Sequence, residues 1–393
     1  MASMLASVGS RILGRRARLE VTDVFREHEG TPFVARCRVS GSDSAPATVV
    51  VKAPRPWKPY EPDKPGGPAA AIFTEWAALE WLGELDVPDV PRLLGADREP
   101  GVLVMSDMAH DRRVDHVLLG EDPVAATDAL REFGASLGRL HAATMGKDPD
   151  EWRRRRERLG PRADFDRRAW FAEQVAHLHR ACEAVGVEAQ GIDDDLETLR
   201  EAWNAGPHHA LTHGDPCPDN LLLDGGRVVI VDFENAACRF APSDAGYARI
   251  PFPSCWCVGA LPDSAVTQME DAYRAAAGFG DDAEWRRLMT LACGQSFLYT
   301  VPTQVTHCLE KDHSWGTTGL RARAPLRSES FAAAARDSGT LDRLAELASG
   351  IAAKCRKLWP DDTHVPPYPA FRLGLRQKKK ARGPPGPRAH TSD

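Results

Sequence analysis

Two short apolar runs on either side of a polar turn form the clearest pattern in the chain. The runs are Leu221–Leu223 and Val228–Val231, and Asp224-Gly225-Gly226 separates them. Aspartate and glycine accept the backbone angles of a tight hairpin turn, including positive φ. The pattern therefore predicts a β-hairpin whose two outer ends lie close together in space.

The N-terminal part of the chain has the short runs that are typical of β-strands. Val21–Val39 contains two such runs, and Thr48–Lys52 and Val102–Met105 are rich in β-branched or other apolar residues. Between them, Ala70–Leu85 carries apolar residues at helical spacing. The pattern predicts a sheet accompanied by one helix.

One acidic side chain falls within the apolar stripe of that helix. At about 100° per residue, Glu75 lies between Leu79 and Leu82 on the helical wheel. A carboxylate that faces inward is costly unless it is paired. We therefore predict that Glu75 has a buried cationic partner. A Glu75 that reaches solvent from a shallow face is the alternative.

Helical spacing dominates the rest of the chain. Apolar residues predict helices at Leu130–His141, Phe171–Val185, Val266–Ala277, Trp285–Thr300 and Leu341–Leu358. The stretch Val301–Arg327 has few such signals, and it could be a mobile loop on the substrate side. Strands, then helices, then a hairpin predict an α+β fold with two lobes.

Composition limits the classes of partner. The chain has 393 residues, 42% of them hydrophobic, which is enough for a core divided between two lobes. The net charge of −6 provides no basic field for nucleic acid. No apolar run approaches about eighteen residues, so we expect no membrane partner. Nine cysteines without CxxC pairs or zinc spacing favour a reducing, cytoplasmic location, and we interpret Cys255 and Cys257 as apolar filling.

Polar residues stand at both outer ends of the predicted hairpin. Asp215 and Asn220 precede the first strand, and Asp232 follows the second. Oxygen ligands of this kind suit Mg²⁺, which proteins hold through one or two carboxylates together with substrate phosphates. Any one of the three could instead cap backbone groups in a turn. Their combination favours a site for a metal and a phosphate.

The spacing of these residues is that of a kinase catalytic loop and metal-binding aspartate, His-x-Asp-x-x-x-x-Asn followed by Asp-Phe. Gly214 stands where protein kinases carry arginine, and Glu234 stands where they carry glycine. The sequence HGDPCPDN followed by DFE resembles the aminoglycoside phosphotransferase and choline kinase family instead. The resemblance extends from about Val21 to about Leu358.

The resemblance implies a two-lobed, protein-kinase-like α+β fold. The small N-terminal lobe would have an antiparallel sheet and one helix, and the larger C-terminal lobe would be mainly helical. We expect a flexible N-terminus (1–20), a nucleotide-binding lobe that ends in a hinge (21–108), a helical lobe with the catalytic loop and acceptor site (109–372), and a disordered basic tail (373–393).

The resemblance also implies roles in the helical lobe. Asp215 would be the catalytic base that takes the proton of the acceptor hydroxyl, and His213 would shape the catalytic loop. Asn220 and Asp232 would hold Mg²⁺. Asp244 would brace the catalytic loop or cap the next helix.

In the N-terminal lobe, Lys52, oriented by Glu75, would steady the α- and β-phosphates of ATP, and GTP is an open alternative. Ser106 and Met108 would form the hinge, whose backbone groups meet the adenine. A phosphate-covering loop would lie at Glu27–Pro32, which lacks a glycine-rich signature and could equally be a plain hairpin turn.

Two segments after the hairpin have open interpretations. Ile250–Pro262 is apolar and rich in proline, and it could line an acceptor pocket or pack in the core. Three acids, Asp263, Glu270 and Asp271, could meet a cationic acceptor, but exposed helix acids are common and we expect them at the surface.

The resulting hypothesis is an ATP-dependent phosphotransferase that moves the γ-phosphate to a hydroxyl of a small molecule, either an aminoglycoside-like antibiotic or a metabolite. We expect a monomer or a homodimer. Two alternatives remain open: a kinase of a housekeeping amino alcohol or sugar such as choline, homoserine or a thiosugar, and a catalytically silent nucleotide-binding module.

Overall fold

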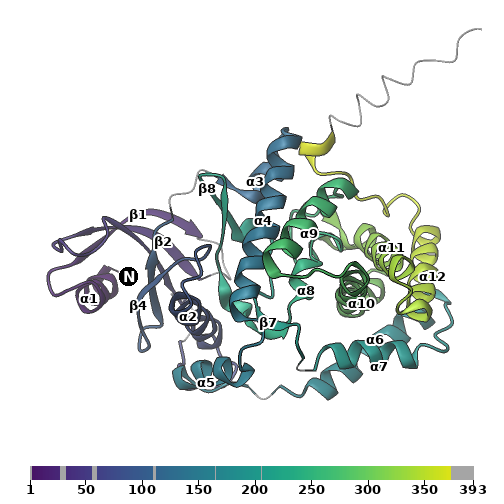
Figure 1. Ribbon diagram of the computed structural model, residues 1–393, viewed down its shortest axis with the longest axis horizontal. Helices are drawn as coiled ribbons and strands as arrows, with labels where there is room; N and C mark the ends of the chain where they lie inside the picture. The colour runs from purple at the N-terminus through teal and green to yellow at the C-terminus, as the bar shows by residue number, and fades with distance from the viewer. Residues whose placement is uncertain are drawn as a thin grey trace, which may run out of the picture.

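A strand-rich part and a larger helical part lie side by side in the computed structural model (Figure 1). The structure describes residues 2–26, 32–54, 60–108, 112–163, 165–204 and 206–372. The expected α+β architecture with two lobes is confirmed. The predicted phosphate-covering loop (27–32, of which only 32 is described) and the predicted basic tail (373–393) lie outside these ranges.

Within the described residues, five strands of the N-terminal lobe form an antiparallel sheet in the order β1-β2-β3-β5-β4. The strands are β1 (Arg18–Arg26), β2 (Phe33–Ser40), β3 (Thr48–Ala53), β4 (Leu93–Asp97) and β5 (Val102–Ser106). Helix α2 (Ala69–Glu84) covers one face of this sheet and α1 (Ala2–Ile12) covers the other.

The alternation of side chains along β3 determines which residues meet which helix. Val49 and Val51 belong to the apolar cluster that α1 completes, whereas Val50 packs in the cluster that contains the α2 core. Because successive side chains of a strand point to opposite faces, Lys52 shares the α2 face with Val50. The sequence pattern of β3 therefore directs Lys52 toward α2.

The N-terminus differs from the expected flexible segment, because residues 2–12 form α1. Val8 is fully buried, and Ile12, one helical turn later, packs on the same apolar cluster. Without α1 this face of the sheet would be exposed to water. The terminus forms a helix because it covers the second, apolar face of the sheet. The composition of the terminus alone gives no information about that face.

The predicted hairpin is present as β8 (Leu221–Asp224) and β9 (Arg227–Ile230), which pair in antiparallel register. Its turn residues Gly225 and Gly226 have φ of 56° and 86°, which is the positive φ that the predicted turn requires. β6 (Arg112–Arg113) extends this small sheet, and β7 (His209–Thr212) pairs with β10 (Ala237–Phe240) beside it.

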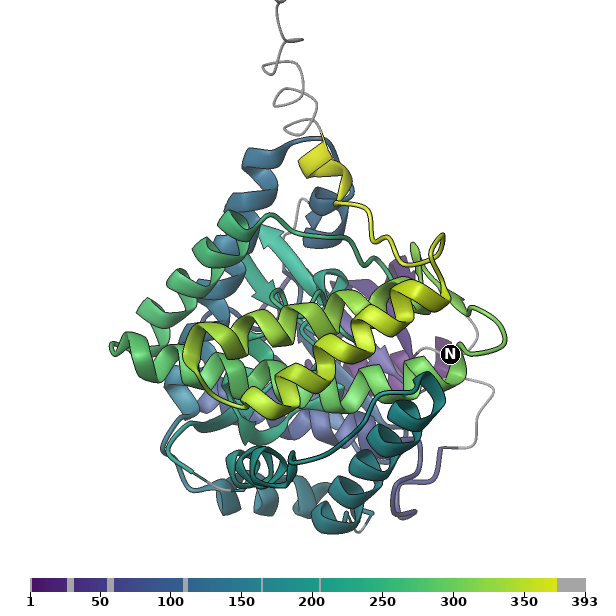
Figure 2. The same ribbon diagram turned by 90° about the vertical axis from the view of Figure 1, so that its right-hand side faces the viewer.

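Helices make up most of the C-terminal lobe, and in Figure 2 the last three, drawn in green to yellow, lie side by side. The α-helices after the N-terminal sheet, within the described residues, are α3 (Val114–Leu118), α4 (Pro123–Thr144), α5 (Pro149–Leu159), α6 (Arg167–Val185), α7 (Asp193–Ala202), α8 (Pro242–Ala245), α9 (Asp263–Ala277), α10 (Asp282–His307), α11 (Leu320–Ser338) and α12 (Asp342–Leu358). Of these, α5 packs against α2 of the N-terminal lobe. Two short 3₁₀ turns, η1 (Pro218–Asn220) and η2 (Phe233–Asn235), flank the hairpin. No helix in the described part of the chain has the length and apolar character to cross a bilayer.

Val301–Arg327, considered as a possible mobile loop, has regular structure over most of its length. Helix α10 continues to His307, a short ladder of β11 (Ser314–Trp315) and β12 (Thr318–Gly319) follows, and α11 begins at Leu320. Pro302 and Pro325 lie inside the two helices and are buried. Proline weakens a helix locally, so here packing between α10, α11 and α12 outweighs the local preference.

Candidate active site

The loop after β7 is held by a buried carboxylate from α8. Asp244 accepts hydrogen bonds from the backbone N–H groups of His213 and Gly214, at 2.6 and 3.2 Å. Burial opposes ionisation of Asp244, but contacts with His141 and with the His213 N–H outweigh it, so the pKa of this carboxyl lies below its usual value. Of the two roles expected for Asp244, bracing the loop is the one that the geometry shows.

His213 links the loop to the end of β9. Its Nε2 lies 2.9 Å from the carbonyl oxygen of Val231, and its Nδ1 lies 3.2 Å from the backbone nitrogen of Asp215. A carbonyl can only accept, so Nε2 carries the proton and Nδ1 accepts from Asp215. The side chain is fully buried with both nitrogens engaged. This arrangement fits a residue that shapes the loop.

The carboxylate of Asp215 has two side-chain donors. Its Oδ1 accepts hydrogen bonds from the hydroxyl of Ser254 and from the thiol of Cys217, the latter at 3.1 Å. The Tyr247 hydroxyl lies 3.2 Å from the Ser254 oxygen and donates to the Gly214 carbonyl at 3.2 Å. These contacts restrict how the carboxylate can turn.

Sequence reasoning did not identify Ser254. It lies in Ile250–Pro262, for which core packing and an acceptor pocket were both open. Ile250 and Phe252 are fully buried and Cys255 is 1% exposed, so most of the segment packs in the core. The serine is the polar position that turns toward Asp215, and a serine between two apolar neighbours gives no signal of this in the sequence.

Asn220 closes the loop on itself and on the hairpin. Its side-chain Nδ2 donates to the backbone oxygen of Asp215 at 3.0 Å, and its own carbonyl accepts from Val231 N–H at 3.0 Å. The structure therefore brings His213, Asp215 and Asn220 together with the end of β9, directly before Asp232.

A buried ammonium group lies at the junction of the two lobes. Lys52 Nζ contacts the Glu75 carboxylate directly, lies 2.5 Å from Asp232 Oδ1, and lies 3.4 Å from Glu234 Oε2. Lys52 and Glu75 are 3% and 2% exposed. The predicted pair is present, and Glu234, which sequence reasoning left without a role, joins it from the position after Phe233.

Three carboxylates thus surround one ammonium. Burial alone would favour a neutral Lys52, but the charges of Asp232, Glu75 and Glu234 outweigh it, so its pKa is raised. Burial raises the pKa of Glu75 to about 7, and the favourable charge of Lys52 offsets this only in part. The cluster holds more negative than positive charge, and a bound cation would neutralise this excess.

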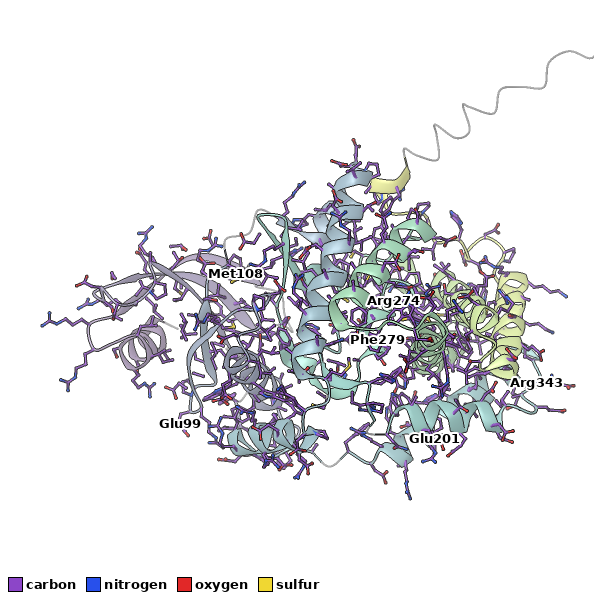
Figure 3. All side chains as sticks on the ribbon, viewed as in Figure 1. Glu99, Met108, Glu201, Arg274, Phe279 and Arg343 are labelled. Carbon is purple, nitrogen blue, oxygen red and sulfur yellow. The ribbon has the colours of Figure 1, made fainter. Side chains whose placement is uncertain are left out.

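A cleft of about 350 Å³ opens beside this cluster. Its lining includes Lys52, Glu75, Ser106, Met108 and Asp232 among the predicted residues, together with Val34, Val50, Met105, Arg112, Arg113 and Asp219. Met108 lies where the strand-rich lobe meets the helical lobe (Figure 3). Asp215 and Asn220 are not part of this lining, but both lie on the same loop as Asp219.

Ser106 at the end of β5 is tied to the strand beside it. Its hydroxyl accepts from the backbone N–H of Arg92 at 2.9 Å, and its own N–H donates to the Arg92 carbonyl at 2.9 Å. Next to it, Asp107 forms an ion pair with Arg36 of β2 at 2.7 Å. The segment expected to be the hinge is therefore tied to the residue before β4 and to β2.

One of the three acids expected at the surface is buried. Glu270 on α9 is 3% exposed and pairs with Arg249, whose Nε lies 2.7 Å from its Oε1. Burial raises the pKa of Glu270, and the arginine opposes that rise. The partner lies in a loop distant in sequence, so helical position alone could not reveal it. Asp263 and Asp271 are exposed, as expected.

Comparison with known proteins supports the resemblance seen in the sequence. The model of the phosphotransferase enzyme family matches residues 18–290. A search of curated proteins finds no match.

Solved structures with a similar course of the chain include three phosphotransferases or kinases by name. Macrolide 2'-phosphotransferase MphH from Brachybacterium faecium has 16% identity and a TM-score of 0.48, over 79% of this chain and 93% of that one. A putative fructosamine-3-kinase from Thermobifida fusca has 21% identity and a TM-score of 0.45, over 84% and 98%. ADP-bound aminoglycoside phosphotransferase APH(2'')-Ib has 12% identity and a TM-score of 0.48, over 90% and 99%.

The family match covers more than half of the chain, from β1 to the first third of α10. It includes the sheet with Lys52, the helix with Glu75 and the β8–β9 hairpin with the Asp215 loop before it. The chain therefore belongs to the phosphotransferase enzyme family and is a small-molecule kinase with the protein-kinase-like fold.

Proposed function

We propose that this enzyme transfers the γ-phosphate of ATP to a hydroxyl group of a small molecule, with GTP as an alternative donor. The observation that carries the proposal is the Lys52 cluster, in which Glu75, Asp232 and Glu234 surround one ammonium beside the catalytic loop. Such a surplus of negative charge at the edge of a cleft suits a site that receives a divalent cation and phosphates.

The donor set fits magnesium. Asp232 offers carboxylate oxygens and Asn220 an amide oxygen, which are hard ligands of the kind that Mg²⁺ prefers. When bound, Mg²⁺ with the nucleotide supplies the phosphoryl group and neutralises charge that develops on it. Asn220 and Asp232 are the residues that would hold the metal.

Lys52 and Glu75 act on the nucleotide side. Glu75 is buried on α2 and fixes the direction of Lys52 through their direct contact. A lysine fixed in this way presents its positive charge to the cleft, where it balances the charge of nucleotide phosphates. Ser106 and Met108 line the same cleft and form the hinge side of the nucleotide site.

Asp215 acts on the acceptor side. Its carboxylate accepts a hydrogen bond from the acceptor hydroxyl, directs that oxygen toward the phosphorus, and takes its proton as the new bond forms. Ser254 and Cys217 hold one carboxylate oxygen, so Asp215 keeps its orientation without help from the acceptor. His213 and Asp244 position the loop and have no part in the transfer itself.

The catalytic loop specifies only that the acceptor is a small molecule with a hydroxyl group. A screen that reads ADP release in Mg²⁺ tests it directly, with aminoglycosides, macrolides, amino alcohols and sugars as acceptors and with ATP and GTP compared. Acceptor-dependent ADP release from one class, absent without Mg²⁺, is the expected result.

A catalytically silent module would bind nucleotide and give no ADP release with any acceptor. It would also lack the slow hydrolysis of nucleotide by water that a functional site shows without acceptor. Binding without either reaction would overturn the proposed function.

A further inference from the structure

Three cysteines gather beside the catalytic loop, from two segments that are far apart in the sequence. Cys217 follows Asp215 on the loop, and Cys255 and Cys257 come from the segment before α9. They are 3%, 1% and 0% exposed. Cys255 Sγ lies 3.2 Å from Cys257 Sγ, and Cys217 Sγ lies 3.2 Å from the Ser254 hydroxyl.

A carboxylate completes the group. The Sγ atoms of Cys217 and Cys255 and a carboxylate oxygen of Asp219 all lie within 4.8 Å of one another. A tetrahedral zinc site with Zn–S bonds of about 2.3 Å places its sulfur ligands about 3.8 Å apart. The three groups are therefore close enough to bind one ion after small movements. Asp219 is half-exposed and lines the cleft, which gives an ion a path from solvent.

Two buried arginines surround the same segment without a carboxylate partner in the described part of the chain. Arg323 donates to the carbonyls of Cys255 and Thr318, at 2.8 and 3.2 Å, and Arg327 donates to the Pro253 carbonyl at 3.0 Å. Both are 0% exposed, and Nε and Nη1 of Arg327 have no hydrogen-bond partner among the described residues.

Buried positive charge is expensive unless negative charge compensates it. Here backbone carbonyl oxygens solvate both guanidinium groups. A divalent ion bound by two thiolates and one carboxylate has the same net charge as two neutral thiols beside that carboxylate, because each cysteine releases a proton when it binds. The ion therefore adds no positive charge beside Arg323 and Arg327.

We infer that Cys217, Cys255 and Asp219, with Cys257 adjacent to Cys255, form a binding site for a soft divalent cation such as Zn²⁺, next to the catalytic base. Selectivity against Mg²⁺ follows from ligand type, since thiolates favour Zn²⁺ and carboxylate or amide oxygens favour Mg²⁺. The site is thus distinct from the Asn220 and Asp232 position.

Occupation of this site has a consequence for catalysis, which rests on the proposed function. The Cys217 thiol donates to Asp215 at 3.1 Å, and a Cys217 thiolate bound to zinc has no proton to donate. Asp215 would lose one of its two side-chain donors. Zinc would therefore slow phosphoryl transfer while the magnesium position remains available.

The test uses Co²⁺ as a spectroscopic substitute for Zn²⁺ in the full-length, reduced protein. One equivalent of Co²⁺ should produce a thiolate-to-cobalt charge-transfer band, and Zn²⁺ should abolish it by displacement. The band should be lost in Cys217→Ala and in Cys255→Ala, weakened in Asp219→Asn, and kept in Cys182→Ala, a buried cysteine on α6 that serves as the control. Far-UV circular dichroism checks that each variant is folded.

No band in the wild type would overturn the inference whatever the variants do. A band of equal strength in Cys255→Ala, or a disulfide between these cysteines in the isolated protein, would also overturn it. This measurement involves neither nucleotide nor acceptor. A negative result would therefore reject the zinc site without testing the proposed function.

Discussion

Replacing Lys52 with methionine removes the ammonium group that Glu75, Asp232 and Glu234 contact, and keeps a side chain of similar length. Glu75 is then a carboxylate with 2% exposure and no cation beside it. Removal of one partner of a buried ion pair costs about 3–5 kcal/mol, because the other charge stays buried. Asp232 and Glu234 are 12% and 30% exposed, so water relieves part of their share. We expect Lys52→Met to lower the free energy of unfolding by about 3–5 kcal/mol near pH 8.

The loss should depend on pH in a defined direction. Glu75 already has a pKa raised to about 7 in the folded protein, and loss of Lys52 raises it further. The folded variant then binds a proton that the unfolded chain releases above a pH of about 4.3. Its stability therefore falls as pH rises, and the destabilisation should be clearly smaller near about pH 5.5 than near about pH 8.

Urea denaturation at the two pH values measures this effect, with tryptophan fluorescence as the signal. Lys64→Met is the matched control, because Lys64 is exposed and pairs with Glu61 at the surface. The double variant Lys52→Met/Glu75→Gln should recover part of the loss, since its glutamine is neutral. A loss below about 1 kcal/mol at both pH values, or one equal to that of Lys64→Met, would refute the reasoning.

Two further predictions concern the loop and the metal. Asp244→Asn replaces the charged acceptor of the His213 N–H by a neutral one. A hydrogen bond to a charged group is worth about 1.5–3 kcal/mol, so kcat should fall about tenfold to a hundredfold, with little change in the KM for nucleotide. An unchanged kcat would contradict the bracing role. Binding of Mg²⁺ with nucleotide should neutralise Asp232, lower the pKa of Glu75 and release a proton near pH 7, so affinity should rise with pH through that range. Calorimetry in buffers of different ionisation enthalpy measures the proton, and Glu75→Gln should abolish it; release that persists in that variant would assign the proton to another group.

Local patterns in the sequence predicted the parts of the site that depend on local structure. The hairpin followed from two apolar runs and a turn with two glycines, and the burial of Glu75 followed from its place in a helical stripe. Both features depend on the period of one element. The pairing of Glu75 with Lys52 followed from the resemblance to kinases. The structure explains it, because Lys52 shares the α2 face of β3 with Val50.

What the sequence did not reveal depends on contacts between distant segments. Ser254 reaches Asp215 across a fold-back of the chain, and Glu270 is buried because Arg249 lies opposite it. Similarly, α1 is ordered by a sheet face that only the assembled lobe presents. In each case burial is decided by a partner that local spacing does not specify.

The central claim is that the Asp215 loop and Asp232 divide the work of transfer and of metal-dependent nucleotide binding. The most direct measurement follows nucleotide affinity in Mg²⁺ and the slow hydrolysis of ATP in parallel, for the wild type, Asp215→Asn and Asp232→Asn. Asp215→Asn should keep its affinity and lose at least about a hundredfold in hydrolysis, and Asp232→Asn should lose the magnesium-dependent part of the affinity. Unchanged hydrolysis in Asp215→Asn, or normal magnesium-dependent binding in Asp232→Asn, would contradict the claim.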